Sequence, residues 1–182
     1  TVLRGGVLQS RKSIAAPGLT VPSPTLTEED LQNLKIAKQC GVTGVMLPFV
    51  RGAEDIRTLR RALQDAGADG IRIFAKIENL TGVQALPELL PLVDEVVIAR
   101  GDLGNTMPLW KLPGVQKRIA RRCREEQKPF CLVTQLLWSM QENPVPTRAE
   151  VADIYNGVLD GAVALMLTGE TAIGKHPVEA MT

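Results

Sequence analysis

Histidine and cysteine are scarce in this sequence. It contains one histidine, His176, and three cysteines, Cys40, Cys123 and Cys131, among 182 residues. The cysteines do not stand at the spacing of a zinc motif, and a lone histidine argues against a histidine-based catalytic triad. An odd number of cysteines also argues against a disulfide framework, so we expect reduced thiols in a cytoplasmic protein.

An excess of charge of either sign is also lacking. The 21 Lys and Arg residues offset 20 Asp and Glu residues, which leaves a formal net charge of +1. No apolar run approaches the roughly 20 residues of a membrane-spanning helix. Since a balanced charge gives no electrostatic attraction to a polyanion, we expect no nucleic acid and no membrane among the partners.

What the sequence does contain is an alternation of short apolar runs and amphipathic stretches. The apolar runs predict strands, at residues 44–50, 71–76, 96–99, 129–134 and 162–167. The amphipathic stretches predict helices, at residues 27–40, 53–66, 81–90, 111–126, 148–159 and from 176 onward. Thr27 and Asp30 have the spacing of a capping box, which marks the start of the first helix.

Buried strands separated by helices predict an α/β protein with a parallel sheet and right-handed crossovers. A doubly wound sheet and a (β/α)8 TIM barrel both satisfy this pattern. No G-x-G-x-x-G follows a strand, which argues against a dinucleotide-binding fold. Because a complete barrel takes about 250 residues, the sequence predicts an incomplete barrel of about five βα units.

Polar residues recur just past the predicted strand ends. They are Arg51, Lys76, Glu78, Arg100, Asp102, Thr134, Gln135 and residues 168–171. In a barrel the carboxyl ends of the strands surround one mouth, where active sites lie. We therefore expect these side chains to converge.

Glu78 and Asp102 offer hard oxygen ligands for a divalent cation. Mg²⁺ usually takes one or two protein carboxylates and completes its shell with water and substrate oxygens. Lys76 and Glu78 are alternate residues, so they point to the same side of the strand, and the lysine could balance a phosphate or an enolate. The alternative is a salt bridge from Lys76 to Glu78 or Asp102.

The glycines around Asp102 suggest a further binding element. Gly101 and Gly104 would let backbone N–H groups approach an anion in a turn, although such turns are common without a ligand. Thr134 could bind either a substrate carboxylate or a backbone group through its hydroxyl. Residues 168–171 could line the mouth or cap the next helix.

Together these runs resemble the pyruvate kinase family. The most specific features are Lys76-Ile77-Glu78-Asn79 and Ala99-Arg100-Gly101-Asp102-Leu103-Gly104. Other matching stretches follow in order, at residues 41–51, 75–83, 99–108, 133–140, 146–150 and 167–172. The resemblance covers nearly all of the chain and implies strands four to eight of a (β/α)8 barrel. It also implies phosphoryl transfer between phosphoenolpyruvate and ADP, giving pyruvate and ATP.

The resemblance assigns roles to the charged residues. Glu78 and Asp102 would bind Mg²⁺ or Mn²⁺, and Lys76 would be the catalytic residue that stabilises the phosphoryl group. Arg11 and Lys12 fall near the family's lid hinge, so they would approach the phosphates of the nucleotide.

The resemblance also implies how the substrate carboxylate is held. The backbone of Gly101 and Asp102 would bind it together with the Thr134 hydroxyl, and Arg100 would brace the site from the preceding position. Four positions depart from the family's usual residues without removing a metal ligand: Thr81, Trp138, Thr168 and Ile173.

For the whole protein, the resemblance implies a homo-oligomer, a tetramer at full length, that also uses K⁺ at a site outside these residues. Residues 1–26 would be the return segment from the lid hinge, and residues 27–182 part of the catalytic barrel. We therefore expect a fragment or a truncated form. Two alternatives stay open: an inactive truncated paralogue that acts by binding, and a Mg²⁺-dependent aldolase or lyase acting on pyruvate enolate.

Overall fold

The computed structural model describes residues 5–7, 10 and 23–182. In these residues the strands form one parallel sheet of five, in the order β1-β2-β3-β4-β5. The strands are β1 Gly44–Leu47, β2 Arg72–Ile77, β3 Glu95–Ala99, β4 Phe130–Val133 and β5 Ala164–Met166. Because β1 and β5 are not paired with each other within the described residues, the sheet is open.

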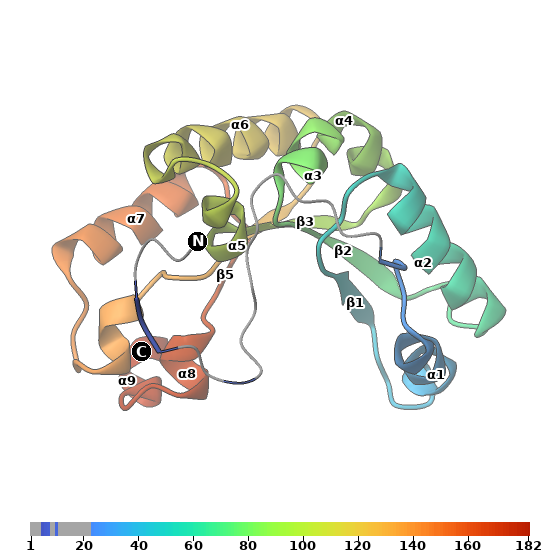
Figure 1. The fold of residues 1–182 in the computed structure, drawn as a ribbon, viewed down its shortest axis with the longest axis horizontal. Coiled ribbons are helices and arrows are strands. Elements are labelled where there is room, and N and C mark those ends of the chain that lie inside the picture. The colour runs from blue at the N-terminus through green and yellow to red at the C-terminus, as the bar shows by residue number, and fades with distance from the viewer. Residues whose placement is uncertain (1–4, 8–9, 11–22) are drawn as a thin grey trace.

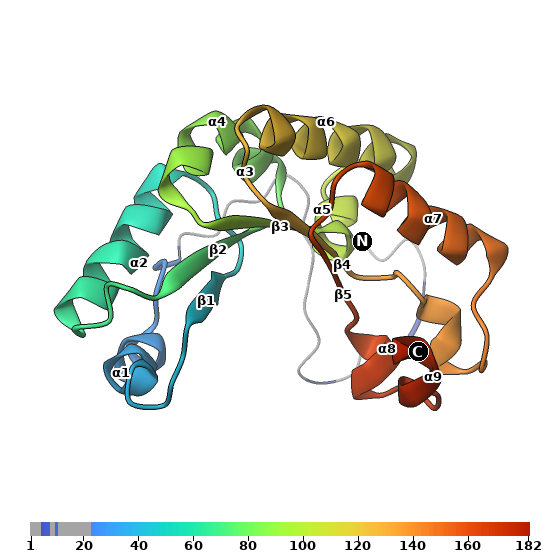
Figure 2. The same cartoon turned by 180° about the vertical axis from the view of Figure 1, so that it is seen from behind.

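Helices lie between and beyond the strands, and the longer ones after β1 cover one face of the sheet. They are α1 Glu28–Ala37, α2 Ala53–Asp65, α3 Leu80–Gln84, α4 Leu86–Leu89, α5 Arg100–Asn105, α6 Leu112–Glu125, α7 Arg148–Leu159, α8 Gly169–Ala172 and α9 Pro177–Met181. Short 3₁₀ helices are η1 Leu90–Leu92, η2 Leu109–Lys111 and η3 Trp138–Gln141. The elements form an arc with α2, α4, α6 and α7 along its outer side (Figure 1). Seen from behind, α1 and α9 lie at the two ends of the arc (Figure 2). This arrangement confirms the predicted incomplete (β/α)8 barrel.

Buried apolar residues lie on both faces of the central strand β3, as is usual in a parallel sheet. In β3, Val96 and Ile98 pack into the large core that the helices share with the sheet. The intervening Val97 and Ala99 belong to a smaller cluster with Cys131 and Val133 of β4. The second cluster marks the inner face of the arc, which is the face that becomes the interior of a barrel.

Local sequence signals set most helix ends. Thr27 and Asp30 form the predicted capping box of α1, and Thr147 and Glu150 form a second one at α7. Gly161 follows α7 with a φ of 92°, a backbone conformation that glycine adopts without strain. The helices α1, α2, α6 and α7 therefore begin and end close to where the sequence predicts.

Three local predictions were wrong. The helix expected at residues 81–90 is divided into α3, α4 and η1, because Pro87 and Pro91 lack the N–H that a continuous helix needs. The first strand ends at Leu47 instead of residue 50, since Pro48 cannot donate and Phe49 takes a φ of 52°. The third difference is α5, which lies where a turn was expected.

Three further expectations concerned the cysteines, membrane-spanning helices and residues 1–26. All three cysteines are free, and burial raises the pKa of the Cys123 thiol to about 12. No helix in the described part of the chain has the length and hydropathy of a membrane span. Most of residues 1–26, with Arg11 and Lys12, lies outside the described residues.

Gly82 allows α3 to approach the loop after β1. A Cβ at this position would lie 2.5 Å from the Val50 carbonyl oxygen, a backbone atom that cannot move aside easily. We expect Gly82→Ala to lower the free energy of unfolding by about 1–3 kcal/mol, the usual cost of overpacking. Urea denaturation measures this. The control is Gly114→Ala in α6, where a Cβ meets only Arg118 Nη1 at 4.0 Å; an equal loss in both variants would contradict the steric explanation.

Candidate active site

Lys76 and Glu78 lie at the carboxyl end of β2. Phe74 of the same strand packs in the inner cluster, so Lys76, two residues later, shares the inner face. The Lys76 Nζ is 2.8 Å from Glu78 Oε1, and the Glu78 side chain is only 1% exposed. Its Oε2 accepts a hydrogen bond of 2.6 Å from the Phe49 amide. Both oxygens of this buried carboxylate therefore have partners, and the structure contains the salt bridge that the sequence left as an alternative.

Arg100 directly follows β3 and is 8% exposed. Its Nη2 donates to the carbonyl oxygens of Thr134 at 2.7 Å and Gln135 at 3.2 Å. Its Nη1 is 2.5 Å from Asp153 Oδ2 of α7. A buried guanidinium requires such partners, and these fix the end of β3 to the end of β4 and to α7.

The residues that Arg100 contacts after β4 are in an unusual conformation. Thr134 and Gln135 have φ values of 75° and 53°, although neither is glycine. A non-glycine residue with left-handed backbone costs about 1–3 kcal/mol of conformational energy, and it persists where surrounding contacts hold it. The Thr134 Oγ1 accepts a hydrogen bond of 2.7 Å from the Gly101 amide. The Thr134 hydroxyl thus contacts the backbone in this structure, and its own proton is left to donate elsewhere.

Residues 100–105 form the helix α5 in place of the turn expected around Asp102, and anion binding by the backbone there stays a prediction. Leu103 is fully buried, and its packing stabilises a helix that two glycines disfavour. Asp102 lies exposed in the first turn. Its carboxylate is favourable there because the amino end of a helix carries partial positive charge.

The register of the sheet brings the predicted residues to one edge. Ile77 of β2 pairs with Ile98 of β3, and Ala99 of β3 pairs with Val133 of β4. Lys76 with Glu78, Gly101 with Asp102, and Thr134 therefore lie at the carboxyl ends of three neighbouring strands. Arg11 and Lys12 fall outside the described residues, so they are not located relative to this edge.

The donor set at this edge suits a hard divalent cation bound mainly by substrate. No group of three or more His, Cys, Asp or Glu side chains is gathered in the part of the chain that the structure describes. Mg²⁺ needs only one or two carboxylates, because substrate oxygens and water complete its shell. Glu78 and Asp102 fit that requirement, whereas a fully protein-coordinated metal does not fit the described residues.

Asp153 was not assigned by sequence reasoning, and Glu170 was expected there only as one of the polar residues 168–171. Asp153 is 53 residues from its partner Arg100, and a partner at that distance leaves no local signal. Glu170 is fully buried and accepts hydrogen bonds from the Leu137 and Thr168 amides. Burial would raise the pKa of Glu170, but these amide hydrogen bonds outweigh it and lower the pKa. Thr168 stands before α8 without a side-chain cap, and Glu170 instead holds the loop.

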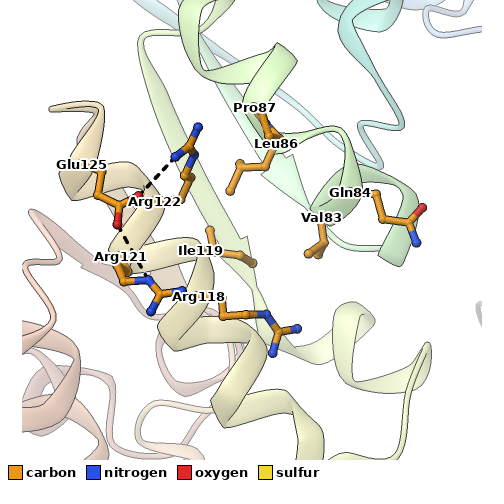
Figure 3. Close-up of a pocket in the computed structure, with 9 residues that line it drawn as sticks. All are labelled: Val83, Gln84, Leu86, Pro87, Arg118, Ile119, Arg121, Arg122 and Glu125. Atoms are coloured by element: carbon orange, nitrogen blue, oxygen red, sulfur yellow. Dashed lines mark hydrogen bonds and ion pairs between the residues drawn. The ribbon is translucent and has the colours of Figure 1, made fainter.

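A groove of about 300 Å³ lies elsewhere, between α3, α4 and α6 (Figure 3). Its lining contains none of the predicted site residues. Arg121 and Arg122 at its rim both pair with Glu125. The basic side chains of α6 there form a surface ion-pair network. No strand end in the described residues lines the groove, so it is separate from the predicted site.

The bond between Gly101 and Thr134 gives a test of the site geometry. Thr134→Val keeps the side-chain shape but leaves the Gly101 amide without its acceptor, which should lower the free energy of unfolding by about 1–2 kcal/mol. Thr134→Ser retains the hydroxyl and should lose less. Urea denaturation of both variants measures the difference. Equal stability of Thr134→Val and the wild type would show that this hydrogen bond is not formed in solution.

Comparisons with known proteins point to one family. A family model described as "Pyruvate kinase, barrel domain" matches residues 1–181. The chain is 43% identical over 181 residues to a pyruvate kinase of Geobacillus stearothermophilus, covering 100% of the chain and 31% of the relative. It is 42% identical over 181 residues to a pyruvate kinase of Mycobacterium tuberculosis, covering 100% of the chain and 38% of the relative.

A pyruvate kinase of Lactobacillus delbrueckii subsp. bulgaricus is 41% identical over 176 residues, with 97% of the chain and 30% of the relative covered. The chain thus spans between 30% and 38% of the length of these three relatives. The family match covers almost every residue, and the fold is part of the expected barrel. The chain therefore belongs to the pyruvate kinase family, within its barrel domain.

Proposed function

We propose that the whole protein transfers a phosphoryl group between phosphoenolpyruvate and ADP, giving pyruvate and ATP. The observation that carries the proposal is the Lys76–Glu78 ion pair at the end of β2, with Asp102 on the helix α5 that follows the neighbouring strand β3. Phosphoryl transfer depends chiefly on positioning and charge neutralisation. A lysine and two carboxylates at neighbouring strand ends provide charges of the kind this reaction needs.

The acidic side chains have the metal-binding role in this proposal. Glu78 and Asp102 bind Mg²⁺ or Mn²⁺, which would supply positive charge to the enolate and phosphoryl oxygens. Lys76 is paired with Glu78 at 2.8 Å in the described structure. If Glu78 held a cation, Lys76 would no longer have to neutralise that carboxylate, and its ammonium group would be available to the phosphoryl group.

The other half of the proposed site binds the substrate carboxylate. Thr134 accepts from the Gly101 amide, which orients its hydroxyl proton away from that amide. That proton is the donor we assign to the substrate carboxylate, together with the Asp102 amide at the amino end of α5. Arg100 contacts the Thr134 carbonyl and keeps the strained residue in place, so its role is positioning.

The family supports further parts of the proposal. We assign residues 1–26 to the return from a lid hinge, with Arg11 and Lys12 near nucleotide phosphates, and residues 27–182 to the catalytic barrel. A K⁺ site outside these residues, a homo-oligomeric assembly and a cytoplasmic location belong to the same proposal. The relatives' own names, "Pyruvate kinase", are what supports it.

Metal binding tests the role of Glu78. We expect the chain to bind Mn²⁺, and Glu78→Gln to raise the dissociation constant at least tenfold, since loss of one charged ligand weakens a site of two carboxylates. Isothermal titration calorimetry measures this. Glu88→Gln on α4, an exposed glutamate, is the matched control and should bind as the wild type does. Equal binding by Glu78→Gln and wild type would remove Glu78 as a ligand.

Turnover tests the role of Lys76 in the whole protein. Lys76→Met should lower kcat by about 10²–10³-fold, the usual loss when a charge that stabilises the transition state is removed. Pyruvate formation is followed by coupling it to NADH oxidation by lactate dehydrogenase. Lys111→Met, which removes an exposed lysine, should leave the rate unchanged. Full activity of Lys76→Met would exclude Lys76 as the catalytic residue.

A further inference from the structure

The loop between β1 and α2 is fixed at several points along its backbone. The Phe49 amide donates to Glu78 Oε2 at 2.6 Å, and the Val50 carbonyl accepts from Asn79 Nδ2 at 3.2 Å. The Arg51 amide, two residues after Phe49, donates to Asp55 Oδ2 at 2.8 Å. Phe49 itself has a φ of 52°, so its amide direction depends on how firmly the flanking residues are held.

Asp55 is the anchor at the far end of this loop. It lies in the first turn of α2 and is 8% exposed. Arg51 contacts both of its oxygens, at 2.7 Å through Nη2 and 3.2 Å through Nε, and the Thr25 hydroxyl donates to Oδ1 at 2.5 Å. Burial alone would raise the pKa of Asp55, but these hydrogen bonds and the Arg51 charge lower it to about 2. The carboxylate is therefore ionised and saturated with donors.

We propose that Asp55 is a positioning residue for the metal site, because it fixes the β1–α2 loop so that the Phe49 amide orients the Glu78 carboxylate. The inference rests on the proposed function, in which Glu78 binds the metal. Hydrogen bonds to a ligating carboxylate set its orientation, and their loss typically weakens metal binding by about 10–100-fold. Asp55 does not contact Glu78 itself and acts through the loop backbone, so we expect a loss of metal affinity of about tenfold, the lower end of that range.

A purely structural role for Asp55 makes a different prediction. An acidic residue in the first turn stabilises a helix through the partial positive charge of its amino end. Glu54 is the neighbouring acidic residue of the same turn, and it pairs with Arg61 on the surface instead of holding the loop. If Asp55 acted only through its charge at the helix end, neutralising it would lower the free energy of unfolding but would leave the hydrogen exchange of the Phe49 amide unchanged.

The test compares Asp55→Asn with Glu54→Gln in the full chain and uses two readouts. The first is hydrogen exchange of the Phe49 amide, measured by NMR without metal. The second is the Mn²⁺ dissociation constant from calorimetry. We expect Asp55→Asn to speed Phe49 exchange and raise the dissociation constant about tenfold, and Glu54→Gln to change neither. Unchanged Phe49 exchange and unchanged Mn²⁺ affinity in Asp55→Asn would overturn the proposal.

A second variant covers the case in which Asp55→Asn does not fold. Arg51→Lys keeps both charges but cannot contact the two oxygens of Asp55 with a planar guanidinium, and it should shift both readouts in the same direction by less. Wild-type exchange and affinity in Arg51→Lys would count against the proposal. If the wild type and Glu78→Gln bind Mn²⁺ equally, the metal assignment fails, and Phe49 exchange alone then decides whether Asp55 positions Glu78.

Discussion

The contact on which this edge of the sheet depends most is the one between the Arg100 guanidinium and the end of β4. Its nitrogens bind the carbonyl oxygens of Thr134 and Gln135, two residues with left-handed backbone, and its charge is balanced by Asp153 of α7. Without this cation, two strained residues would lose the partners that hold their carbonyl groups. The position of the Thr134 hydroxyl, and with it the partner of the Gly101 amide, follows from this one side chain.

At the end of β2 the buried charge is negative, and it too is held by named partners. Glu78 is a buried anion at the end of β2, and its partners are Lys76 and a backbone amide from the preceding βα loop. In both halves of the edge a buried charge has at least one partner from an adjacent unit, because burial without partners is costly. The buried charges at this edge therefore also join neighbouring units.

The sequence predicted the parts of this structure that local patterns determine. Apolar runs located all five strands, and the capping box at Thr27 and the glycine after α7 located helix ends. The recurrence of polar residues after strands also predicted which of them share an edge. Local patterns could not predict α5, since its two glycines disfavour a helix and the burial of Leu103 that supports it depends on the fold. The partners Asp153 and Asp55 were missed because their importance comes from side chains that the fold, rather than the sequence, brings near.

The strand order has a consequence for how the molecule comes together. Every strand pairs with the strand that precedes or follows it in the chain. The contact between Phe49 and Glu78 spans 29 residues, and the one between Arg100 and Thr134 spans 34. Both contacts therefore join units that follow each other directly in the chain, and each closes a loop of only about thirty residues. Because the entropic cost of closing a loop grows with its length, neither half of the edge requires distant parts of the described chain to meet.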